Sequence, residues 1–416
     1  MGSKKLKVLI SAYACEPHKG SEPGVGWNWS KQIAKFAEAW VITRANNREV
    51  IEEELKKNSD PNLHFVYVDL PKWMRFWKKR QIGVRTYYYL WQFVAFKKAL
   101  EYNKKIRFAL SHHVTFVNDW LPSFLALLPI PFIWGPIGSH PSIPLRFLPD
   151  NRIKILEIIR RVIQNTFRYF DPFFYITLFR AKSIIMINKR LQRKYPFSLL
   201  PQSKIFSISA IGINIDNIRS KTHREKGSNT LKIIIISVGR FIYIKAFHLA
   251  LKAFAEASKK INDIELNIIG DGMEKGELQT LTHKLGINKH VVFSGNISRG
   301  DVLERMVESD IFLFPSFEGG GMVVLEAMTA GLPVVCLDFG GPGEMVTEEC
   351  GIKVKPITPE QTIKDLADAI LKLANDPELR KKMGKAARRR VEEYYSWNKK
   401  GEFIQKIYNS LPNRSL

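Results

Sequence analysis

The chain has 416 residues, of which 45 % are hydrophobic and 12 % aromatic, so it can bury the cores of two or three domains. This composition excludes a wholly disordered chain. The formal net charge of +24 predicts anionic partners, which could be nucleic acid, a negatively charged membrane surface or phosphorylated substrates. The charge alone does not choose among them.

The three cysteines are too few and too scattered for a disulfide framework or a zinc site, which predicts buried thiols in a reducing compartment. No apolar run reaches the roughly 18 residues that a membrane-spanning helix needs. Residues 4–15 weakly resemble a lipoprotein signal, but their short apolar stretch runs into a glycine-rich turn, as a first β-strand would. We therefore expect a cytoplasmic protein.

Short β-rich runs alternate with longer helical runs in the first half of the chain. A helix is expected at residues 27–39, and strands are expected at 8–14, 40–43, 108–111, 131–134, 183–188 and 204–208. A polar stretch at 214–232 has the composition of a linker.

A second alternating set follows the linker. Strands are expected at 231–238, 264–269, 291–294, 311–315 and 333–337, and helices at 247–260, 274–285, 299–308, 321–330, 362–375 and 378–393. The pattern predicts an α/β protein with two doubly wound domains of parallel sheet, at 1–218 and 219–397, facing a central cleft. A last helix within 398–416 could pack back on the first domain.

Cations and glycines follow the first strand of the second domain. Gly239, Arg240 and Lys245 stand directly after the strand that ends at residue 238, and an arginine fork with a lysine point charge suits a diphosphate. A solvated basic loop is the alternative. Gly270 and Gly272, which follow the next strand, add to the case for a ligand site.

Residues 318–326 strengthen this interpretation. Gly320 and Gly321 allow a ligand to approach the main chain, and the helix that follows offers an anion site at its N–H groups near Met322 and Val323. Glu318 and Glu326 are eight positions apart, about 12 Å along a helix. A sugar nucleotide has this span and carries hydroxyl groups at both ends, for which carboxylates are natural acceptors. The alternative is a helix start that uses glutamate for its own stability.

Residues 237–354 resemble the donor half of retaining glycosyltransferases of family 4, which have the GT-B fold. The shared patterns are Gly-Arg-x4-Lys, Pro-Ser-x-Glu-Gly, Glu-x7-Glu and Gly-Gly-Pro-x-Glu, at 239–245, 315–319, 318–326 and 340–344. The resemblance implies that Arg240 and Lys245 bind the diphosphate, that Glu318 meets the donor sugar and that Glu326 meets the ribose. Ala246 is a departure, because the family often has glycine there.

Three segments of the first half also resemble the family. Gly24 and Gly26 lie in a glycine-rich turn after the first strand, which implies a position near the acceptor and the donor phosphates. The family has a cleft histidine at the end of the strand that here carries His112 and His113; His112 is slightly favoured, and a packing histidine is the alternative. Trp134 and Gly138 belong to a Trp-Gly-Pro-x-Gly segment that is expected to line the acceptor side.

The basic surplus is concentrated in the first domain. Residues 72–107 hold eleven Lys or Arg against one acid, and residues 146–194 hold twelve against three. The aromatic residues interleaved with the first set are Trp73, Phe76, Trp77, Tyr87, Tyr88, Tyr89, Trp91, Phe93 and Phe96. Such segments suit an anionic bilayer surface, and a solvated face over an aromatic core is the alternative. No recognised nucleic-acid module occurs, so no nucleic-acid partner is expected.

We therefore expect a retaining glycosyltransferase, peripheral at the inner face of the membrane, that moves a hexose-type sugar from a UDP- or GDP-sugar to a hydroxyl of a glycolipid or polysaccharide precursor. The residues expected to be catalytic are His112, His113, Arg240, Lys245 and Glu318. No Asp-x-Asp sequence occurs, so no cofactor and no obligatory metal are expected, and cations with a helix N-terminus would stabilise the leaving diphosphate. The alternatives are a sugar-nucleotide epimerase or hydrolase on the same fold, and a non-catalytic scaffold on membranes or anionic polymer.

Overall fold

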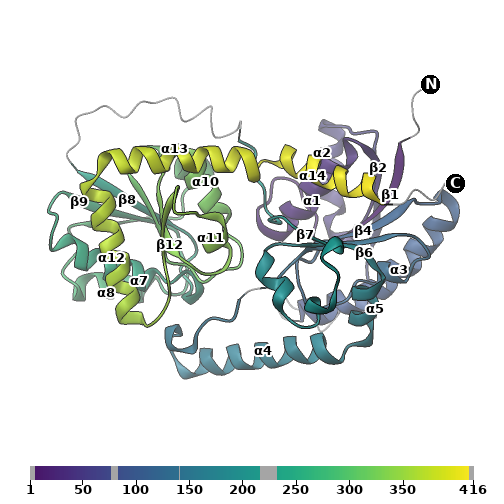
Figure 1. Ribbon diagram of the computed structural model, residues 1–416, viewed down its shortest axis with the longest axis horizontal. Helices are drawn as coiled ribbons and strands as arrows, with labels where there is room; N and C mark the ends of the chain where they lie inside the picture. Colours follow the sequence, from purple (N-terminus) through teal and green to yellow (C-terminus); the bar gives the residue numbers. More distant parts are fainter. Residues whose placement is uncertain (1–4, 76–82, 140, 216–231, 412–416) are drawn as a thin grey trace. The chain divides into compact units, whose positions relative to one another are not determined.

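The computed structural model describes residues 5–75, 83–139, 141–215 and 232–411 (Figure 1). The chain divides into two compact units. Unit 1 comprises Met1–Ser139, Arg160–Gly212 and Trp397–Leu416, and unit 2 comprises His140–Ile159 and Ile213–Ser396.

Unit 1 is built on a seven-stranded sheet in the order β3-β2-β1-β4-β5-β6-β7, in which every neighbouring pair is parallel. Its strands are β1 (Leu6–Ala12), β2 (Ala37–Arg44), β3 (Leu63–Val68), β4 (Leu110–Thr115), β5 (Phe132–Ile137), β6 (Ala181–Met186) and β7 (Ile205–Ser207). Its helices are α1 (Ser21–Ala34), α2 (Arg48–Lys57), α3 (Val84–Ile106), α5 (Pro172–Arg180) and α14 (Trp397–Ser410). The strand order reverses between β1 and β4, which is where open parallel sheets place their ligands.

Two apolar cores cover the two faces of this sheet. In β1, Leu9 belongs to the core that contains Trp91 of α3, whereas Val8 and Ile10 belong to the core that contains Trp29 of α1. This division follows from the two-residue period of a β-strand. Strands β4 and β5 are buried at every position, as expected of central strands covered on both faces.

Unit 2 is built on a six-stranded parallel sheet in the order β10-β9-β8-β11-β12-β13. Its strands are β8 (Ile233–Val238), β9 (Ile264–Ile269), β10 (Val291–Gly295), β11 (Ile311–Phe314), β12 (Val334–Leu337) and β13 (Gly351–Val354). Its helices are α7 (Phe247–Ser258), α8 (Lys275–Lys284), α9 (Arg299–Glu308), α10 (Met322–Ala330), α11 (Gly340–Met345), α12 (Pro359–Asn375) and α13 (Pro377–Tyr394). Here the strand order reverses between β8 and β11.

The two doubly wound α/β units predicted from the sequence are confirmed. Among the predicted helices α1 differs most: it begins at Ser21 and ends at Ala34, so the expected glycine-rich turn forms its first two turns, and residues 37–39 belong to β2. Helices α2, α3, α4, α5 and α11 were not predicted. The division of the chain into units also differs from the prediction of a single boundary after residue 218, because residues 140–159 cluster with unit 2. Phe147 of this segment packs on Phe317, with ring centroids 5.1 Å apart. Most of the expected linker, residues 216–231, lies outside the described residues.

Helix α4 (Asn151–Phe170) is divided between the two units after Ile159. Helix α14, from the end of the chain, belongs to unit 1 and packs on α1. Trp397 at its start meets Trp29 edge to face, with ring centroids 6.5 Å apart.

Candidate active site

The predicted donor-binding residues of unit 2 follow three adjacent strands. Gly239 and Arg240 follow β8, Gly270 and Gly272 follow β9, and Glu318 follows β11. The carboxyl ends of parallel strands meet at one edge of the sheet, and β8 and β11 flank the point at which the strand order reverses. The topology therefore gathers these residues at the edge where a doubly wound sheet binds ligands.

Close main-chain packing joins the loops after β8 and β9. The N–H of Phe241 donates to the main-chain oxygen of Asp271 at 2.9 Å. Gly270 has φ +147°, and a β-carbon there would lie 1.9 Å from the carbonyl oxygen of Gly239. Only glycine fits this position, because a side chain would collide with backbone.

A partly buried ion pair joins the loop after β8 to the loop after β11. The ammonium nitrogen of Lys245 lies 2.5 Å from Oε2 of Glu318, and the two side chains are 13 % and 16 % exposed. The same nitrogen lies over the ring of Phe314, 4.8 Å from its centroid. The carbonyl oxygen of Ile244 accepts from the N–H of Phe317 at 2.8 Å, which fixes the two loops together.

The second oxygen of Glu318, Oε1, is buried and has no hydrogen-bond partner among the described residues. Burying such an oxygen without a donor costs free energy. The arrangement therefore leaves one carboxylate acceptor available to a hydroxyl donor, while the other oxygen is held by Lys245.

The N-terminus of α10 lies next in the chain and has no side-chain cap. Gly321 precedes it with φ +141°, and the first N–H groups of the helix, beginning with Met322 and Val323, have no partner within the helix. The N–H of Gly341 donates to the carbonyl oxygen of Glu318 at 3.1 Å, and a β-carbon at Gly341 would lie 2.0 Å from the carbonyl oxygen of Gly320. The loop thus presents main-chain donors to an anion at the positive end of the helix dipole.

Arg240 is exposed and makes no ion pair with any residue that the structure describes. It stands at the end of β8, two positions after Val238. Because its charge is not neutralised by a carboxylate, its guanidinium is available to an anionic ligand.

Glu326 is paired with an arginine that the sequence analysis did not identify. Its Oε1 lies 2.6 Å from the guanidinium of Arg299, the first residue of α9. Burial raises the pKa of the Glu326 carboxyl, and Arg299 partly offsets this effect. The signal that could have found Arg299 is a serine–arginine pair at a helix start. Ser298 caps α9 by accepting from the N–H of Asp301 at 3.2 Å, and Arg299 follows it directly.

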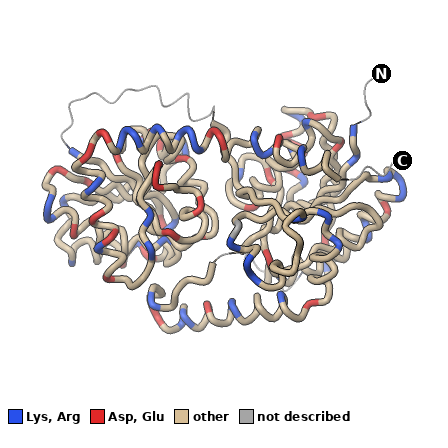
Figure 2. Tube along the Cα trace, in the orientation of Figure 1, with Lys and Arg blue, Asp and Glu red and all other residues tan. Residues whose placement is uncertain are grey.

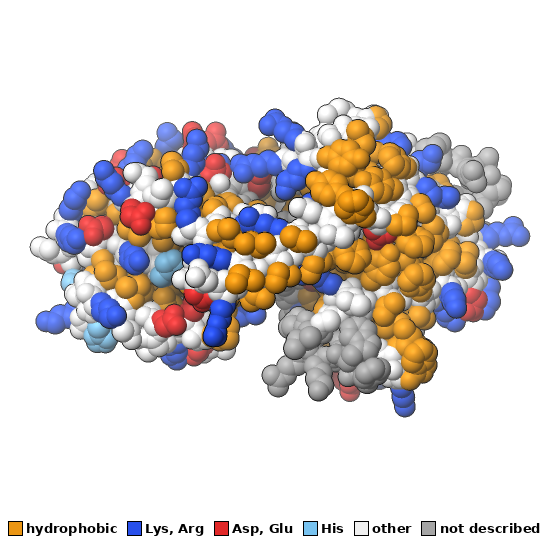
Figure 3. All heavy atoms as spheres, turned by 90° about the horizontal axis from the view of Figure 1, so that it is seen from below, with side chains coloured by type: hydrophobic (Ala, Val, Ile, Leu, Met, Phe, Trp, Pro, Cys, Tyr) orange, Lys and Arg blue, Asp and Glu red, His pale blue; other side chains and the backbone are white. Residues whose placement is uncertain are grey.

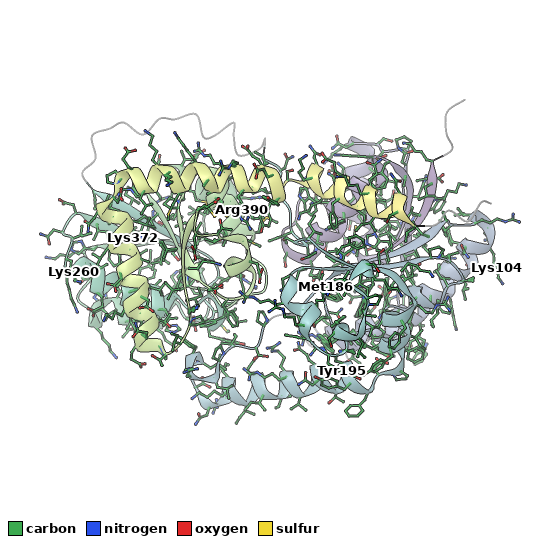
Figure 4. All side chains as sticks on the ribbon, in the orientation of Figure 1. Lys104, Met186, Tyr195, Lys260, Lys372 and Arg390 are labelled. Atoms are coloured by element: carbon green, nitrogen blue, oxygen red, sulfur yellow. The ribbon has the colours of Figure 1, made fainter. Side chains whose placement is uncertain are left out.

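Helix α11, which carries the Gly-Gly-Pro-x-Glu pattern, is held by α13. Arg390, which is labelled in Figure 4, is a residue of α13. Its guanidinium donates to the main-chain oxygens of Met345 at 2.6 Å and Glu344 at 3.2 Å. These bonds satisfy carbonyl groups at the end of a short helix and fix the segment next to the α10 loop.

In unit 1 the two histidines of β4 have different surroundings. Nδ1 of His112 lies 2.8 Å from the hydroxyl of Tyr408, and its Nε2 lies 2.6 Å from the carbonyl oxygen of Gly135, so both ring nitrogens are engaged inside the unit. Nε2 of His113 lies 3.1 Å from the carbonyl oxygen of Phe116, and its Nδ1 is buried with no partner among the described residues. Burial lowers the pKa of His112 to about 3 and that of His113 to about 4, so both rings are neutral at pH 7. This geometry reverses the slight preference for His112.

Other residues expected on the acceptor side have packing roles. Trp134 is fully buried against Phe174, with ring centroids 5.6 Å apart, and does not line a surface. A β-carbon at Gly24 or Gly26 would lie 2.0 Å from a carbonyl oxygen of the preceding loop, and one at Gly138 would lie 2.3 Å from the Ile187 side chain. The pattern of small and aromatic residues therefore serves close contact between elements of unit 1.

Glu22, in the first turn of α1, is a polar group that the sequence analysis left without a role. Its two carboxyl oxygens accept from the N–H of Val117 at 3.1 and 3.3 Å, which links α1 to the segment after β4. These elements flank the point where the strand order of unit 1 reverses. Burial raises the pKa of Glu22 to about 7, and the Val117 N–H opposes this shift. A carboxyl with this pKa changes its charge near neutral pH.

The aromatic residues of the basic segment 72–107 are mostly core residues where the structure describes them. Tyr87, Tyr88 and Trp91 are fully buried in unit 1, so they offer nothing to a bilayer. Trp73 and Phe93 are exposed, whereas Phe76 and Trp77 lie outside the described residues.

All three cysteines are buried free thiols, as predicted. In the described part of the chain, no group of three or more His, Cys, Asp or Glu side chains is arranged to hold a metal ion. Within the same ranges, no helix has the length and apolar character needed to cross a membrane.

Residues 218–390 match the family model "Glycosyl transferases group 1". The chain is 29 % identical over 202 residues to the GDP-mannose-dependent monoacylated alpha-(1-6)-phosphatidylinositol monomannoside mannosyltransferase of Corynebacterium glutamicum, covering 47 % of this chain and 51 % of that protein. It is 26 % identical over 291 residues to the capsular polysaccharide biosynthesis glycosyltransferase CapM of Staphylococcus aureus, covering 65 % of this chain and 73 % of CapM. The alignment thus spans about half the length of the first of these relatives.

Among solved structures, Anabaena HepE in complex with UDP superposes with a TM-score of 0.65 at 16 % sequence identity, over 98 % of this chain and 100 % of HepE. At this identity the likeness establishes the fold: the chain has the two Rossmann-like units of the GT-B fold. Residues 218–390, which form most of unit 2, are thus similar to the group 1 glycosyl transferases, which agrees with the resemblance to glycosyltransferases seen in the sequence.

Proposed function

We propose that the protein is a retaining glycosyltransferase, that unit 2 binds a nucleotide diphosphate sugar and that unit 1 binds the acceptor. The observation that carries this proposal is the Lys245–Glu318 pair next to the uncapped N-terminus of α10. It combines a cation, free main-chain donors and an unpaired carboxylate oxygen at the strand edge where doubly wound sheets bind ligands.

Each part of the donor has a partner in this arrangement. The diphosphate is bound by Arg240, by Lys245 and by the N–H groups at the start of α10. A hydroxyl of the sugar donates to Oε1 of Glu318, which has no protein partner among the described residues. The ribose hydroxyls donate to Glu326, whose orientation is fixed by Arg299.

The transfer proceeds on the face of the sugar that the leaving group occupies. The bond from the anomeric carbon to the β-phosphate oxygen breaks, the bond to the acceptor oxygen forms on the same face, and the acceptor proton passes to the leaving phosphate. Configuration is thereby retained. Arg240, Lys245 and the α10 N–H groups stabilise the charge that develops on the diphosphate, each cation by about 2–4 kcal/mol. These groups replace a metal ion, so the reaction needs neither a metal nor a cofactor.

The donor nucleoside is uridine or guanosine, and the acceptor is a hydroxyl of a glycolipid or polysaccharide precursor at the membrane surface. The names of two relatives support this range, since one is dependent on GDP-mannose and named for a phosphatidylinositol mannoside, and the other is named for capsular polysaccharide biosynthesis. Of the two histidines, His113 has the unpaired ring nitrogen, but it is as buried as Trp134, so neither histidine is assigned a contact with the sugar or the acceptor.

The cleanest test removes Arg240, because it is exposed and its truncation breaks no ion pair with the described residues. Truncating Lys245 would also leave the partly buried Glu318 carboxylate unpaired and so mix activity with stability. We expect Arg240→Ala to lower sugar transfer from UDP- or GDP-hexoses to glycolipid acceptors in vesicles at least tenfold with an unchanged melting temperature.

Lys260→Ala is the matched control, since it removes one exposed positive charge from the same unit, and it should transfer like wild type (Figure 4). Transfer by Arg240→Ala at the wild-type rate would refute the role of this arginine. Donor consumption at the same rate without acceptor would instead identify a sugar-nucleotide hydrolase or epimerase.

A further inference from the structure

Helix α4 buries polar side chains and exposes apolar ones. Glu157, Gln164 and Arg168 are buried. The exposed apolar side chains, which are 36–79 % exposed, are Ile155, Leu156, Ile158, Ile159, Val162, Ile163, Phe167, Tyr169 and Phe170. Their spacing of three and four residues places them on one broad face of the helix. Apolar side chains run along this segment in Figure 3.

Specific polar contacts hold the helix in this orientation. The guanidinium of Arg168 lies 3.0 Å from the carboxylate of Asp119, which is fully buried in unit 1. The carboxylate of Glu157 accepts from the N–H of Ile143 at 3.2 Å within unit 2. Turning the apolar face inward would break both contacts and leave buried charges unpaired, which is costly. The exposure of the apolar face is therefore built into the fold.

The charges along α4 indicate what covers this face. The helix carries five Lys or Arg, of which Arg168 is buried and paired with Asp119, and its one acid, Glu157, is buried too, so the exposed face presents cations and no carboxylate. Figure 2 shows the cations spaced along the helix. The next helix, α5, adds the exposed Ile176 and Phe179. A second copy of so basic a helix would meet like charges, whereas an anionic lipid surface offers both apolar chains and complementary charge.

The C-terminal end of α4 adds aromatic side chains suited to a membrane interface. Tyr169 stacks on Tyr195, which is labelled in Figure 4, with ring centroids 5.8 Å apart. Phe170 is the most exposed apolar residue of the helix. Amphipathic aromatic rings prefer the level of the lipid headgroups.

We propose that α4 is the element that binds the membrane: it lies in the plane of an anionic bilayer surface, with its apolar face among the upper acyl chains and its cations at the headgroups. This proposal names the element that would bring the protein to the membrane where the acceptor is proposed to lie. It rests on the proposed function only for that location of the acceptor. It assigns the contact to α4 instead of the aromatic residues of α3, which are largely core residues.

The test is flotation of the full chain with phosphatidylcholine vesicles that contain about 30 mol% phosphatidylglycerol. Ile155→Gln combined with Val162→Gln removes two exposed apolar side chains seven residues apart on one face, with a good helix former in their place. We expect the membrane-bound fraction to fall at least tenfold. The matched control is Ile357→Gln with Val292→Gln, which removes the same two side-chain types from exposed positions of unit 2, and it should float like wild type.

Flotation of the α4 variant at the wild-type level would overturn the proposal, as would failure of wild type to float. Light scattering after gel filtration without lipid gives a further check: a wild-type dimer that the α4 variant converts to monomer would show that a second copy covers the face. Arg240→Ala separates this proposal from the proposed function, because it should float fully while losing sugar transfer. A protein that floats but transfers no sugar would contradict the enzymatic proposal alone.

Discussion

The two units share one architecture, yet the residues at their strand reversals are used differently. In unit 2 the loops after β8 and β11 keep an exposed arginine, an unpaired carboxylate oxygen on Glu318 and an uncapped helix start. In unit 1 the corresponding segments are packed: both nitrogens of His112 are engaged and Trp134 is fully buried. Glycine-rich segments therefore fit main chain to main chain in both units, and in unit 2 they also accompany the unpaired groups of a candidate ligand site.

The largest expected effect is a loss of stability when a buried residue of unit 1 is truncated, and it would sharpen this contrast. Trp134→Ala removes a fully buried ring that packs on Phe174 and Phe197, and we expect it to cost about 4 kcal/mol of unfolding free energy. A thermal melt should show a fall of about 10 °C, with nucleotide binding in unit 2 unchanged below the transition. A variant that melts like wild type but loses sugar transfer would show that Trp134 contacts substrate after all.

The next effect tests whether Glu22 titrates as its surroundings predict. Its pKa is raised to about 7, so the folded protein holds this proton more tightly than the unfolded chain. The resulting stability is complete below the ordinary pKa of about 4.5 and is lost as the pH rises through 7. We expect Glu22→Gln to be more stable than wild type by about 2 kcal/mol at pH 8 and nearly equal to it at pH 5.

Melting temperatures measured from pH 5 to pH 8 check this prediction. Glu49→Gln in α2, which removes an exposed carboxyl of the same unit, should run parallel to wild type over the whole range. Parallel curves for Glu22→Gln as well would mean that Glu22 is an ordinary carboxyl.

The smallest effect concerns the arginine that the sequence analysis missed. Arg299→Ala removes the ion-pair partner of Glu326, and burial then raises the pKa of this carboxyl further. We expect nucleoside diphosphate affinity to fall by about 1 kcal/mol at pH 8 and by more at pH 6, because a raised pKa favours the protonated carboxyl as the pH falls. Calorimetric titrations at both pH values measure the difference, with Arg305→Ala on the same helix as control. Equal affinities for the three proteins would place Glu326 outside the nucleotide site.

The position of the candidate donor-binding residues of unit 2 at one sheet edge could be predicted because these residues follow strands that are plain in the sequence. Strong hydrophobic strands precede each loop, and in a parallel sheet the ends of β8, β9 and β11 must meet at one edge. The departure from the family pattern at Ala246 can also be described in physical terms. It has φ +50°, a left-handed conformation that glycine adopts at lower cost, which accounts for the glycine frequent in the family.

The remaining features depend on tertiary contacts that no local pattern reveals. His112 and His113 are adjacent, and the pleat sends them to opposite faces, but the sequence does not say which face meets α14. The start of α1 at Ser21 requires glycine at position 26 because the carbonyl oxygen of Ala14 lies against it. The amphipathic pattern of α4 is plain in the sequence, but its outward direction follows from Asp119, far away in the chain.

Calorimetric titration of UDP and GDP into wild type, Arg240→Ala and Lys260→Ala tests the central claim most directly, because it requires neither the sugar nor the acceptor to be known. The account predicts that wild type and Lys260→Ala bind one of these nucleotides with equal affinity and that Arg240→Ala binds it at least tenfold more weakly. Equal binding by all three proteins, or binding of neither nucleotide by wild type, would contradict a diphosphate site at the strand edge of unit 2.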